Sequence, residues 1–557
     1  MSAGVVRRVL MLLLAVLLVL VWQGSLDSPF VYDDKIEVVG NATLRDLDEW
    51  RAIATYNVSR PLLVLSYALD FARNGLQPRG YHLSNLLVAG LAAWWAFLLA
   101  ESLLRLARIS QPMLRAGLVA AIWVAHPMGV EAVVYITGRS ESLCALFSFF
   151  SLWAWAEALR LEREGERGTP WRAASLLAFL GAVSSKEVGA MVPAAALAME
   201  LLFATGGLGA RLRSVRWAWM VPTAALIGLA AWLRLQHAAS FLPKEVDRPL
   251  LVQLLTQSES WLHYLRLWLL PWGQTIFHHL PDADPAGLRA WLALGGWVAV
   301  VLAGLAWGRK VPLAGLALLC GALFLLPSSS FVALKENMAE HRAYQTGFWL
   351  LLAIGATVPE RWGRAALGLG VAAILGLGGL SQLRHRAWSS EVALWQEAVD
   401  RGPEVAQAWY GLADAHRFAA DFDRAIEAYR RALELEPSYL DAWTNLGIAQ
   451  ASLGDVGGAR ESFRSALRES PTYCKAHANL GVLAAGQKDW DEAMVAFRTA
   501  ALYCPDNARA HLGLCELYRG PIRDRERAIF HCEAYLVLAP TSEQSQQVKE
   551  WVLELTF

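Results

Sequence analysis

The chain has 557 residues, of which 55% are apolar and 18% are charged, and it contains 50 basic (Lys and Arg) and 50 acidic (Asp and Glu) residues. A chain with no net charge lacks the basic field typical of nucleic-acid binders, so no nucleic-acid partner is expected. Long apolar stretches fill residues 1–385, whereas residues 386–557 have the composition of a soluble protein. We therefore expect an all-α chain with a polytopic membrane domain over 1–385 and a separate soluble domain over 386–557.

The first apolar run, residues 6–23, contains the basic pair Arg7 and Arg8. This arrangement is typical of a cleavable signal peptide and also of a first transmembrane helix. No small-x-small cleavage site follows Trp22, and many apolar runs come later in the chain. We predict a retained first span with a cytoplasmic N-terminus.

Ten further stretches are apolar enough to be spans, each of which needs roughly 20 residues at about 1.5 Å per residue. With the first run, the predicted spans are 6–23, 82–104, 114–126, 143–160, 172–185, 188–205, 217–235, 288–307, 311–327, 343–358 and 364–381. Basic loops tend to stay cytoplasmic, and the basic loops here alternate correctly with these spans. About eleven spans would place residues 386–557 on the extracytoplasmic side.

Residues 250–272 are apolar but are interrupted by polar residues such as Gln257, Glu259 and Arg266. A span here would move the basic loop 308–310 to the outer side, against the charge rule. We predict an amphipathic helix that lies at the outer membrane interface.

The predicted threading places four polar stretches on the outer face: the loop 24–81 and the segments 125–142, 184–189 and 328–345. Ionisable groups at membrane depth are costly and tend to line sites or water-filled cavities. A single pair is as well explained by an interfacial salt bridge, but four stretches on one face favour a cavity with both signs of charge. The residues concerned are Asp33, Asp34, Glu131, Arg139, Lys186, Glu187, Glu336, Glu340, His341 and Arg342.

The C-terminal half repeats with a period of 34 residues. Pro403, Pro437, Pro471 and Pro505 keep this step, and Pro540 comes one residue late. Residues 442–471 have the tetratricopeptide-repeat (TPR) pattern of Leu-Gly, small Ala, aromatic, Ala and Pro. We predict a half-repeat at 386–403, four repeats over 406–542 and a capping helix at 543–555. Such an α-solenoid offers a concave surface for peptides or partner proteins.

Four of the six cysteines lie in the repeats. A helical hairpin brings Cys474 and Cys504 to the same end, and Cys515 and Cys532 face each other in the next repeat. An oxidising compartment would permit both disulfides, and free buried thiols are the alternative.

Several motifs, in this order along the chain, resemble the transmembrane-and-tetratricopeptide-repeat (TMTC) O-mannosyltransferases of the GT-C glycosyltransferase class. They are "FVYDDK", residues 60–87, residues 125–143, "SSKEVG", "AEHRAY" and the repeat array. The resemblance implies a GT-C-like fold, an active site at the outer membrane face and a polyprenyl- or dolichyl-phosphate mannose donor. It also implies that Ser and Thr hydroxyls of extracytoplasmic proteins are the acceptors. The chain departs from the family by having Tyr344-Gln345-Thr346 in place of Tyr-Leu-Pro.

In this class an acidic residue of the first outer loop is the catalytic base, and that motif falls here on Asp33 and Asp34. A hydroxyl needs a base to take its proton as it attacks, and cations stabilise the phosphate that leaves. We predict that one aspartate is the base and that the other orients the base or the acceptor. The alternative is a purely structural role for the pair, as a helix cap or in a solvated turn. Predicted phosphate ligands are Arg139, Lys186, Arg342 and, more weakly, His341; predicted supporting groups are Glu131, Glu187, Glu340 and His82. Paired carboxylates can bind Mg²⁺ or Mn²⁺, but no residues complete a ligand set, so no metal is predicted.

Two other functions fit the sequence. One is a GT-C enzyme that transfers a different sugar or modifies pilin, lipid or polysaccharide, and the other is a non-catalytic membrane-anchored repeat scaffold. The composition favours a bacterial inner membrane, with the repeats in the periplasm. The sequons at Asn41 and Asn57 would matter only in the endoplasmic reticulum, which is the alternative.

Overall fold

The computed structural model describes residues 2–204, 208–236, 248–308, 310–327, 334, 336–539, 542 and 544–556. The chain divides into two compact units, Met1–Leu394 and Trp395–Phe557. Every regular element in these described ranges is a helix, which confirms the predicted all-α class.

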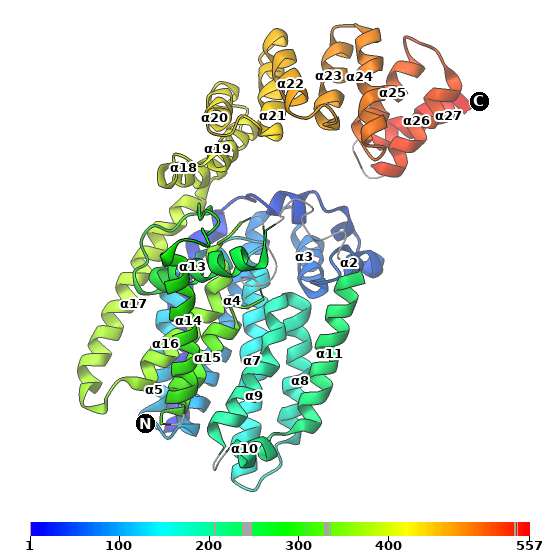
Figure 1. Cartoon of the computed structure of the whole chain (residues 1–557). Helices are drawn as coiled ribbons and strands as arrows, with labels where there is room; N and C mark the ends of the chain where they lie inside the picture. The colour runs from blue at the N-terminus through cyan, green and yellow to red at the C-terminus, as the bar shows by residue number, and fades with distance from the viewer. Residues whose placement is uncertain are drawn as a thin grey trace. The chain divides into compact units, whose positions relative to one another are not determined.

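The first unit, here called the membrane unit, is a helical bundle (Figure 1). A helix occupies each of the eleven stretches predicted to span the membrane. They are α1 (Ala3–Trp22), α4 (Pro78–Leu106), α5 (Pro112–Ala125), α7 (Arg139–Arg163), α8 (Thr169–Ser185), α9 (Val192–Phe203), α11 (Trp217–Gln236), α14 (Leu288–Trp307), α15 (Pro312–Leu323), α16 (Tyr344–Thr357) and α17 (Gly363–His385).

Five helical segments of the described chain are long and apolar enough to cross a membrane: Gly4–Asp27, Pro78–Leu106, Arg139–Arg163, Leu288–Trp307 and Glu360–Ser389. A sixth is possible if α5 and residues Pro127–Val133, which are bent by 64°, count as one span. The protein is therefore a membrane protein, and the predicted number of eleven spans stays a prediction.

The bend after α5 has a local cause. His126 precedes Pro127, and a residue before proline is disfavoured in the helical conformation. His126 is extended, with φ −76° and ψ 132°, and its Nδ1 accepts a hydrogen bond from the Met128 amide at 3.2 Å. The helix must end here, and a new turn starts at Pro127.

The two ends of the bundle differ. The short helices α2 (Trp50–Tyr56) and α3 (Pro61–Asn74) gather at one end together with α13 (Leu250–Leu269), and the N-terminus and α10 (Leu208–Ser214) lie at the other (Figure 1). Several polar side chains that interrupt α13 face the protein, since Gln257 and Ser260 both donate to the Asn337 carbonyl at 3.2 Å, whereas Arg266 is exposed. Its leucines at 250, 251, 262 and 269 are exposed. The helix is amphipathic as predicted, and its interfacial position stays a prediction.

The second unit, here called the repeat unit, is a row of helical hairpins. Its helices are α18 (Glu391–Arg401), which begins just before the unit boundary, α19 (Ala406–Phe418), α20 (Phe422–Leu435), α21 (Leu440–Ser452), α22 (Val456–Glu469), α23 (Cys474–Gly486), α24 (Trp490–Tyr503), α25 (Ala508–Arg519), α26 (Arg525–Leu538) and α27 (Ser545–Thr556). The repeat prediction is confirmed, although Pro540 lies outside the described residues. Of the two alternatives for the repeat cysteines, the structure has the disulfides, Cys474–Cys504 and Cys515–Cys532.

Glycine allows the two helices of a repeat to approach closely. A Cβ at Gly447 would lie 2.5 Å from the ring of Phe463, and one at Gly481 would lie 2.7 Å from the ring of Phe497. The Leu-Gly step in the sequence motif therefore makes room for the aromatic residue of the second helix.

Candidate active site

The acidic loop is anchored by its second aspartate. Asp34 is fully buried; its Oδ2 accepts a hydrogen bond from the Val31 amide at 3.2 Å, and its Oδ1 accepts one from the Thr137 amide at 2.9 Å. Burial raises the pKa of Asp34 to about 7, although these two backbone donors oppose the shift. Asp34 thus ties the loop to the segment before α7 and has no exposed face for a substrate.

Asp33, in contrast, has an exposed face. The Asp33 amide donates to the Tyr135 hydroxyl at 3.0 Å, which places the residue beside the same segment before α7. Partial removal from water raises the pKa of Asp33, while the Tyr135 hydroxyl and the charge of Arg60 lower it. The net upward shift brings this carboxylate closer to the range in which a general base works best.

Arg60 is a cation of this site that is not among the predicted site residues. It directly precedes Pro61 at the start of α3, and its Nη2 lies 3.2 Å from both carboxylate oxygens of Glu187. The charge of Arg60 acts on Asp33, on Glu37 and on His341. The feature of the sequence that could have indicated Arg60 is its position inside residues 60–87, a segment that carries part of the family resemblance.

Lys186 and His341 lie next to this group. Lys186 is buried, and its Nζ forms an ion pair of 2.7 Å with Glu141. Burial lowers the pKa of His341 to about 3, and the positive charges of Lys186, Arg342 and Arg60 act in the same direction. The lowered pKa disfavours a cationic His341 ring, whose Nδ1 lies 3.0 Å from Glu131, and its role as a phosphate ligand stays a prediction.

Arg342 completes the group. Its Nη1 donates to the Glu336 carbonyl oxygen at 3.0 Å, and the Glu336 carboxylate accepts from the Tyr32 hydroxyl at 3.0 Å. No carboxylate within the described residues forms an ion pair with Arg342. Two hydrogen bonds thus connect Tyr32, the residue before Asp33, through Glu336 to Arg342. We call Asp33, Arg60, Lys186, His341 and Arg342 the outer polar cluster.

Arg139 does not join this cluster. It is 1% exposed, and its guanidinium forms an ion pair of 2.6 Å with Asp70. Further hydrogen bonds run to Asn85 Oδ1 at 2.6 Å and to the Tyr81 carbonyl at 2.8 Å. The predicted phosphate ligand is therefore a clamp that joins α3, α4 and α7. Its partner Asp70 lies far away in sequence, so no local pattern revealed the pair.

The predicted supporting groups hold the loops of this end in place. Glu131 Oε2 accepts from the His341 amide at 3.0 Å and lies 3.0 Å from His341 Nδ1, and His82 Nε2 lies 2.9 Å from the Ser28 carbonyl. Glu340 lies 2.8 Å from both the Thr275 amide and His278 Nε2. Glu187 pairs with Arg60, as described above. No three His, Cys, Asp or Glu side chains within the described ranges are arranged to hold a metal ion.

Comparison with known proteins matches most of the chain to one group. Protein O-mannosyl-transferase TMTC4 of Mus musculus is 26% identical over 482 residues, which cover 73% of this chain and 64% of the mouse protein. The Homo sapiens TMTC4 is 26% identical over 70% of this chain and 61% of the human protein. Drosophila melanogaster Tmtc1 is 33% identical over a shorter stretch, which covers 23% of this chain and 16% of the fly protein. The chain is TMTC-like. It spans less than two thirds of the length of these relatives.

The repeats of this TMTC-like chain match separately. The tetratricopeptide-repeat family model covers residues 379–419 and 413–473. A tetratricopeptide-repeat protein of Thermus thermophilus has 21% sequence identity, a TM-score of 0.27, and covers 33% of this chain and 95% of its own. The pilus biogenesis factor PilW has 18% sequence identity and a TM-score of 0.27, and the match covers 36% of this chain and 87% of the PilW chain.

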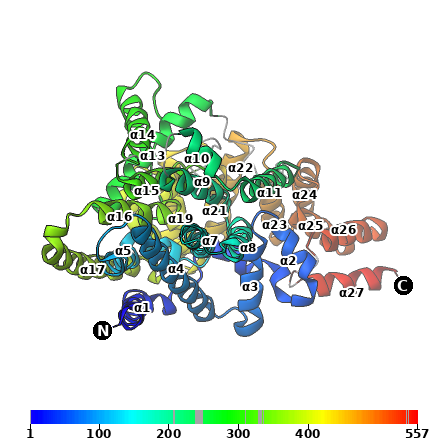
Figure 2. The ribbon, with the colours of Figure 1, turned by 90° about the horizontal axis from the view of Figure 1, so that it is seen from below.

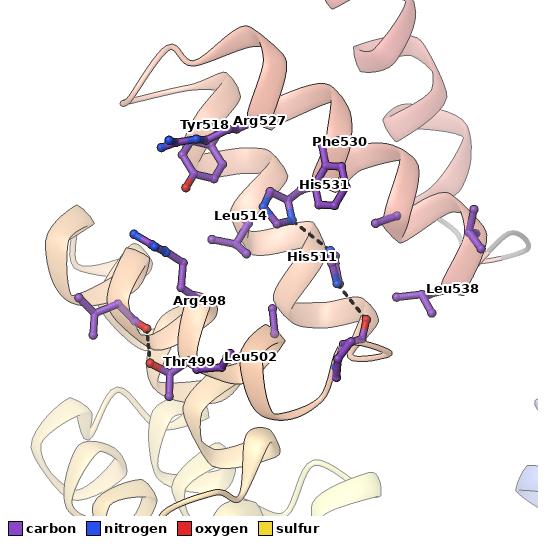
Figure 3. A pocket seen from close by; sticks show the side chains of 15 residues that line it. Arg498, Thr499, Leu502, His511, Leu514, Tyr518, Arg527, Phe530, His531 and Leu538 are labelled. Carbon is purple, nitrogen blue, oxygen red and sulfur yellow. Dashed lines mark hydrogen bonds between the residues drawn. The ribbon is translucent and has the colours of Figure 1, made fainter.

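Two grooves lie in the repeat unit of the TMTC-like chain. One, of about 470 Å³, is lined by polar side chains of α19, α21 and α23, among them Asp414, Asn445 and Asn479. The other, of about 1030 Å³, is lined by α24, α25 and α26 (Figure 3). In the second groove Arg498 and Arg527 lie on one side, Leu502 lies near Arg498 on the same helix, and Leu538 lies on the other side. Either groove is large enough to hold a peptide side chain or a short segment.

Proposed function

We propose that this protein is a membrane glycosyltransferase that moves mannose from a polyprenyl-phosphate carrier to Ser or Thr hydroxyls of extracytoplasmic proteins. Support comes from the O-mannosyl-transferase activity for which its relatives are named and from the outer polar cluster. The observation that carries the proposal is the placement of Asp33, an exposed carboxylate with a raised pKa, beside a group of cations.

In the proposed reaction, Asp33 takes the proton of the acceptor hydroxyl as its oxygen attacks the anomeric carbon of the sugar. A new carbon–oxygen bond forms, and the bond between the anomeric carbon and the phosphate oxygen breaks. The electron pair goes to the phosphate, whose growing negative charge needs cations nearby. Asp33 carries the proton away, so the charges balance.

Arg342 is the best placed cation for that phosphate. Its guanidinium donates to a backbone oxygen and forms no ion pair with a carboxylate of the described residues, although the charge of the Glu336 carboxylate acts on it. Its planar fork could therefore bind a phosphate. Lys186 and Arg60 already pair with Glu141 and Glu187 and supply a weaker net charge. Asp34 positions the loop and does not touch the substrate.

The repeat unit would bind the acceptor protein in one of its grooves. The polar groove presents Asn445 and Asn479 at equivalent positions of successive repeats, 34 residues apart. The amide of Asn445 donates to Tyr410 and Asp414, and that of Asn479 is bonded to Lys475 and Arg509. Amide side chains both donate and accept hydrogen bonds, so their remaining positions suit a peptide backbone. The Asn445→Ala, Asn479→Ala double variant should raise KM for a folded protein acceptor and leave KM for a short Ser/Thr peptide unchanged.

The deciding experiment uses Asp33→Asn in the full chain, reconstituted in vesicles with polyprenyl-phosphate mannose and a Ser/Thr acceptor. Loss of a general base reduces transfer by about 10²- to 10⁴-fold. Asp48→Asn is the matched control, because Asp48 is an exposed aspartate of the same outer loop. Transfer by Asp33→Asn at the parental rate would exclude Asp33 as the base. Transfer from polyprenyl-phosphate glucose but not mannose would correct the sugar, and no transfer from either donor by the parent would favour the scaffold.

A further inference from the structure

A second charged cavity lies at the opposite end of the membrane unit, among α1, α4 and α7. Its volume is about 550 Å³, and it is lined by five arginines and three glutamates together with a few apolar side chains. Figure 2 views the bundle from this end and shows α4 between α1 and α7. This is the end with the N-terminus, which the charge distribution of the loops predicts to face the cytoplasm.

The three glutamates of this cavity are already neutralised. Glu101 is 2% exposed and forms ion pairs with Arg7 at 2.9 Å and with Arg105 at 2.6 Å. Arg160 lies 2.8 Å from both Glu157 and Glu164. Every carboxylate of the cavity therefore has an arginine partner.

Arg108 and Arg163 are the two arginines of the cavity that do not pair with these glutamates. Within the described residues, no carboxylate forms an ion pair with Arg108 or Arg163. The Arg163 guanidinium donates a hydrogen bond to the Phe203 carbonyl, which carries no full charge. Arg108 and Arg163 lie close enough for their positive charges to act on each other. Two like charges beside one cavity repel each other unless an anion lies between them.

An aromatic row continues from the cavity along the bundle. Trp153 lines the cavity, and its ring centroid lies 4.9 Å from that of Trp95, which in turn stacks on Phe150 at 4.4 Å. All three side chains are half-buried. Trp95 and Phe150 are nearer the middle of their helices than the cavity residues are. The cationic cavity thus borders an accessible apolar surface that runs toward the membrane interior.

We propose that this cavity binds the phosphate headgroup of an anionic phospholipid of the cytoplasmic leaflet, with Arg108 and Arg163 as its ligands. The acyl chains lie along the row of Trp95, Phe150 and Trp153. Basic pockets between transmembrane helices on the cytoplasmic side suit such headgroups, and the planar guanidinium group matches phosphate geometry. The site is separate from the outer polar cluster and does not depend on the transferase proposal.

The test is native mass spectrometry of the full chain, titrated with phosphatidylglycerol or with phosphatidylcholine. The Arg108→Gln, Arg163→Gln double variant should lose about 25-fold of the parent's preference for phosphatidylglycerol, because each of the two arginines that bind the headgroup contributes about fivefold. The matched control is Arg361→Gln, Arg364→Gln, which removes two exposed arginines at the start of α17, outside the cavity. The control should keep the parental preference.

Further measurements make each outcome decisive. The Arg108→Lys, Arg163→Lys variant keeps both charges and should retain most of the preference, which separates loss of binding from misfolding. Inorganic phosphate serves as a second probe in a thermal-stability titration. If phosphate stabilises the parent but not the Gln double variant, and the parent shows no lipid preference, the same arginines bind a free anion and the lipid proposal is overturned. Equal phosphatidylglycerol binding by the parent and the Gln double variant would overturn it as well.

Discussion

The membrane unit buries many ionisable side chains, whereas the repeat unit buries almost none. Asp34, Asp70, Glu101, Glu131, Arg139, Glu141, Arg172, Lys186, Glu200, Glu340 and Arg384 are all buried in the membrane unit. In the described part of the repeat unit, no Asp, Glu, Lys or Arg is buried. Burial of a charge is costly unless it is paired. The difference shows that the membrane unit relies on specific charge pairs, and the repeat unit relies on packing of small and aromatic side chains.

The pair of Arg139 and Asp70 should show the largest effect on stability. Asp70→Asn leaves a buried guanidinium without its carboxylate, and breaking such a pair costs about 3–5 kcal/mol. The measurement is the free energy of unfolding of the full chain in mixed detergent micelles. Arg73→Gln, which removes an exposed charge from the same helix, is the control and should change stability by less than about 0.5 kcal/mol. An equally small change in Asp70→Asn would contradict the proposed clamp.

The buried carboxyl of Asp34 should make stability depend on pH. Its pKa is raised in the folded protein to about 7, whereas the unfolded chain has the ordinary value near 3.8. Between these values the folded state binds a proton that the unfolded state does not, so stability decreases as pH rises from about 4 to 7. The slope is about 1.4 kcal/mol per pH unit.

The measurement is the difference in unfolding free energy between the parent and Asp34→Asn, followed from pH 4 to pH 8. The parent should lose stability relative to the variant as pH rises to 7, and the difference should then stay constant. A difference that is independent of pH across this window would show that Asp34 titrates near its ordinary value.

In the repeat unit, covalent links take the place of buried charge pairs. Removing the Cys474–Cys504 disulfide, which closes a loop with a sequence separation of 30 residues, should cost about 2–4 kcal/mol. The Cys474→Ala, Cys504→Ala variant should show faster hydrogen exchange in α23 and α24, while exchange in α4 and α7 stays unchanged. Equal exchange in α23 and α24 of both proteins would mean that the disulfide adds nothing to their stability.

An exposed pair in the repeats should show the smallest effect. Arg431 and Glu434 lie 2.6 Å apart on α20, and both are largely exposed. Such pairs contribute about 0–1 kcal/mol, so Arg431→Ala should leave the thermal midpoint of the repeat unit nearly unchanged. A large drop would show that surface charge matters in this unit as well, and the contrast between the units would disappear.

The two units also differ in how far the sequence predicts them. The 34-residue period predicted the helical hairpins, because each repeat uses the same local packing of Gly447 or Gly481 against an aromatic ring. Hydropathy predicted the positions of the eleven bundle helices, because apolar length is a local property. It did not predict the break at His126 and Pro127, because that break is set by the residue before a proline and not by apolar length.

The sequence did not predict which charged side chains form pairs with one another. The predicted threading of the membrane puts Asp33, Lys186 and Arg342 on one face, and the structure brings them into one cluster. Arg139 was assigned to the same group, but it pairs with Asp70, a residue of a different helix. Arg60 is not among the predicted site residues, because its position before Pro61 is that of an ordinary helix start. Which charge meets which depends on helix packing over long sequence distances.

The repeat helices contact mainly their neighbours along the chain, as α21 contacts α19, α20, α22 and α23. In such an array a whole repeat can be duplicated or deleted by unequal recombination without disturbing distant contacts. The length of the array can therefore change in evolution while the membrane unit stays the same. Homologues with more or fewer 34-residue units, attached to a bundle of constant size, are the expected outcome.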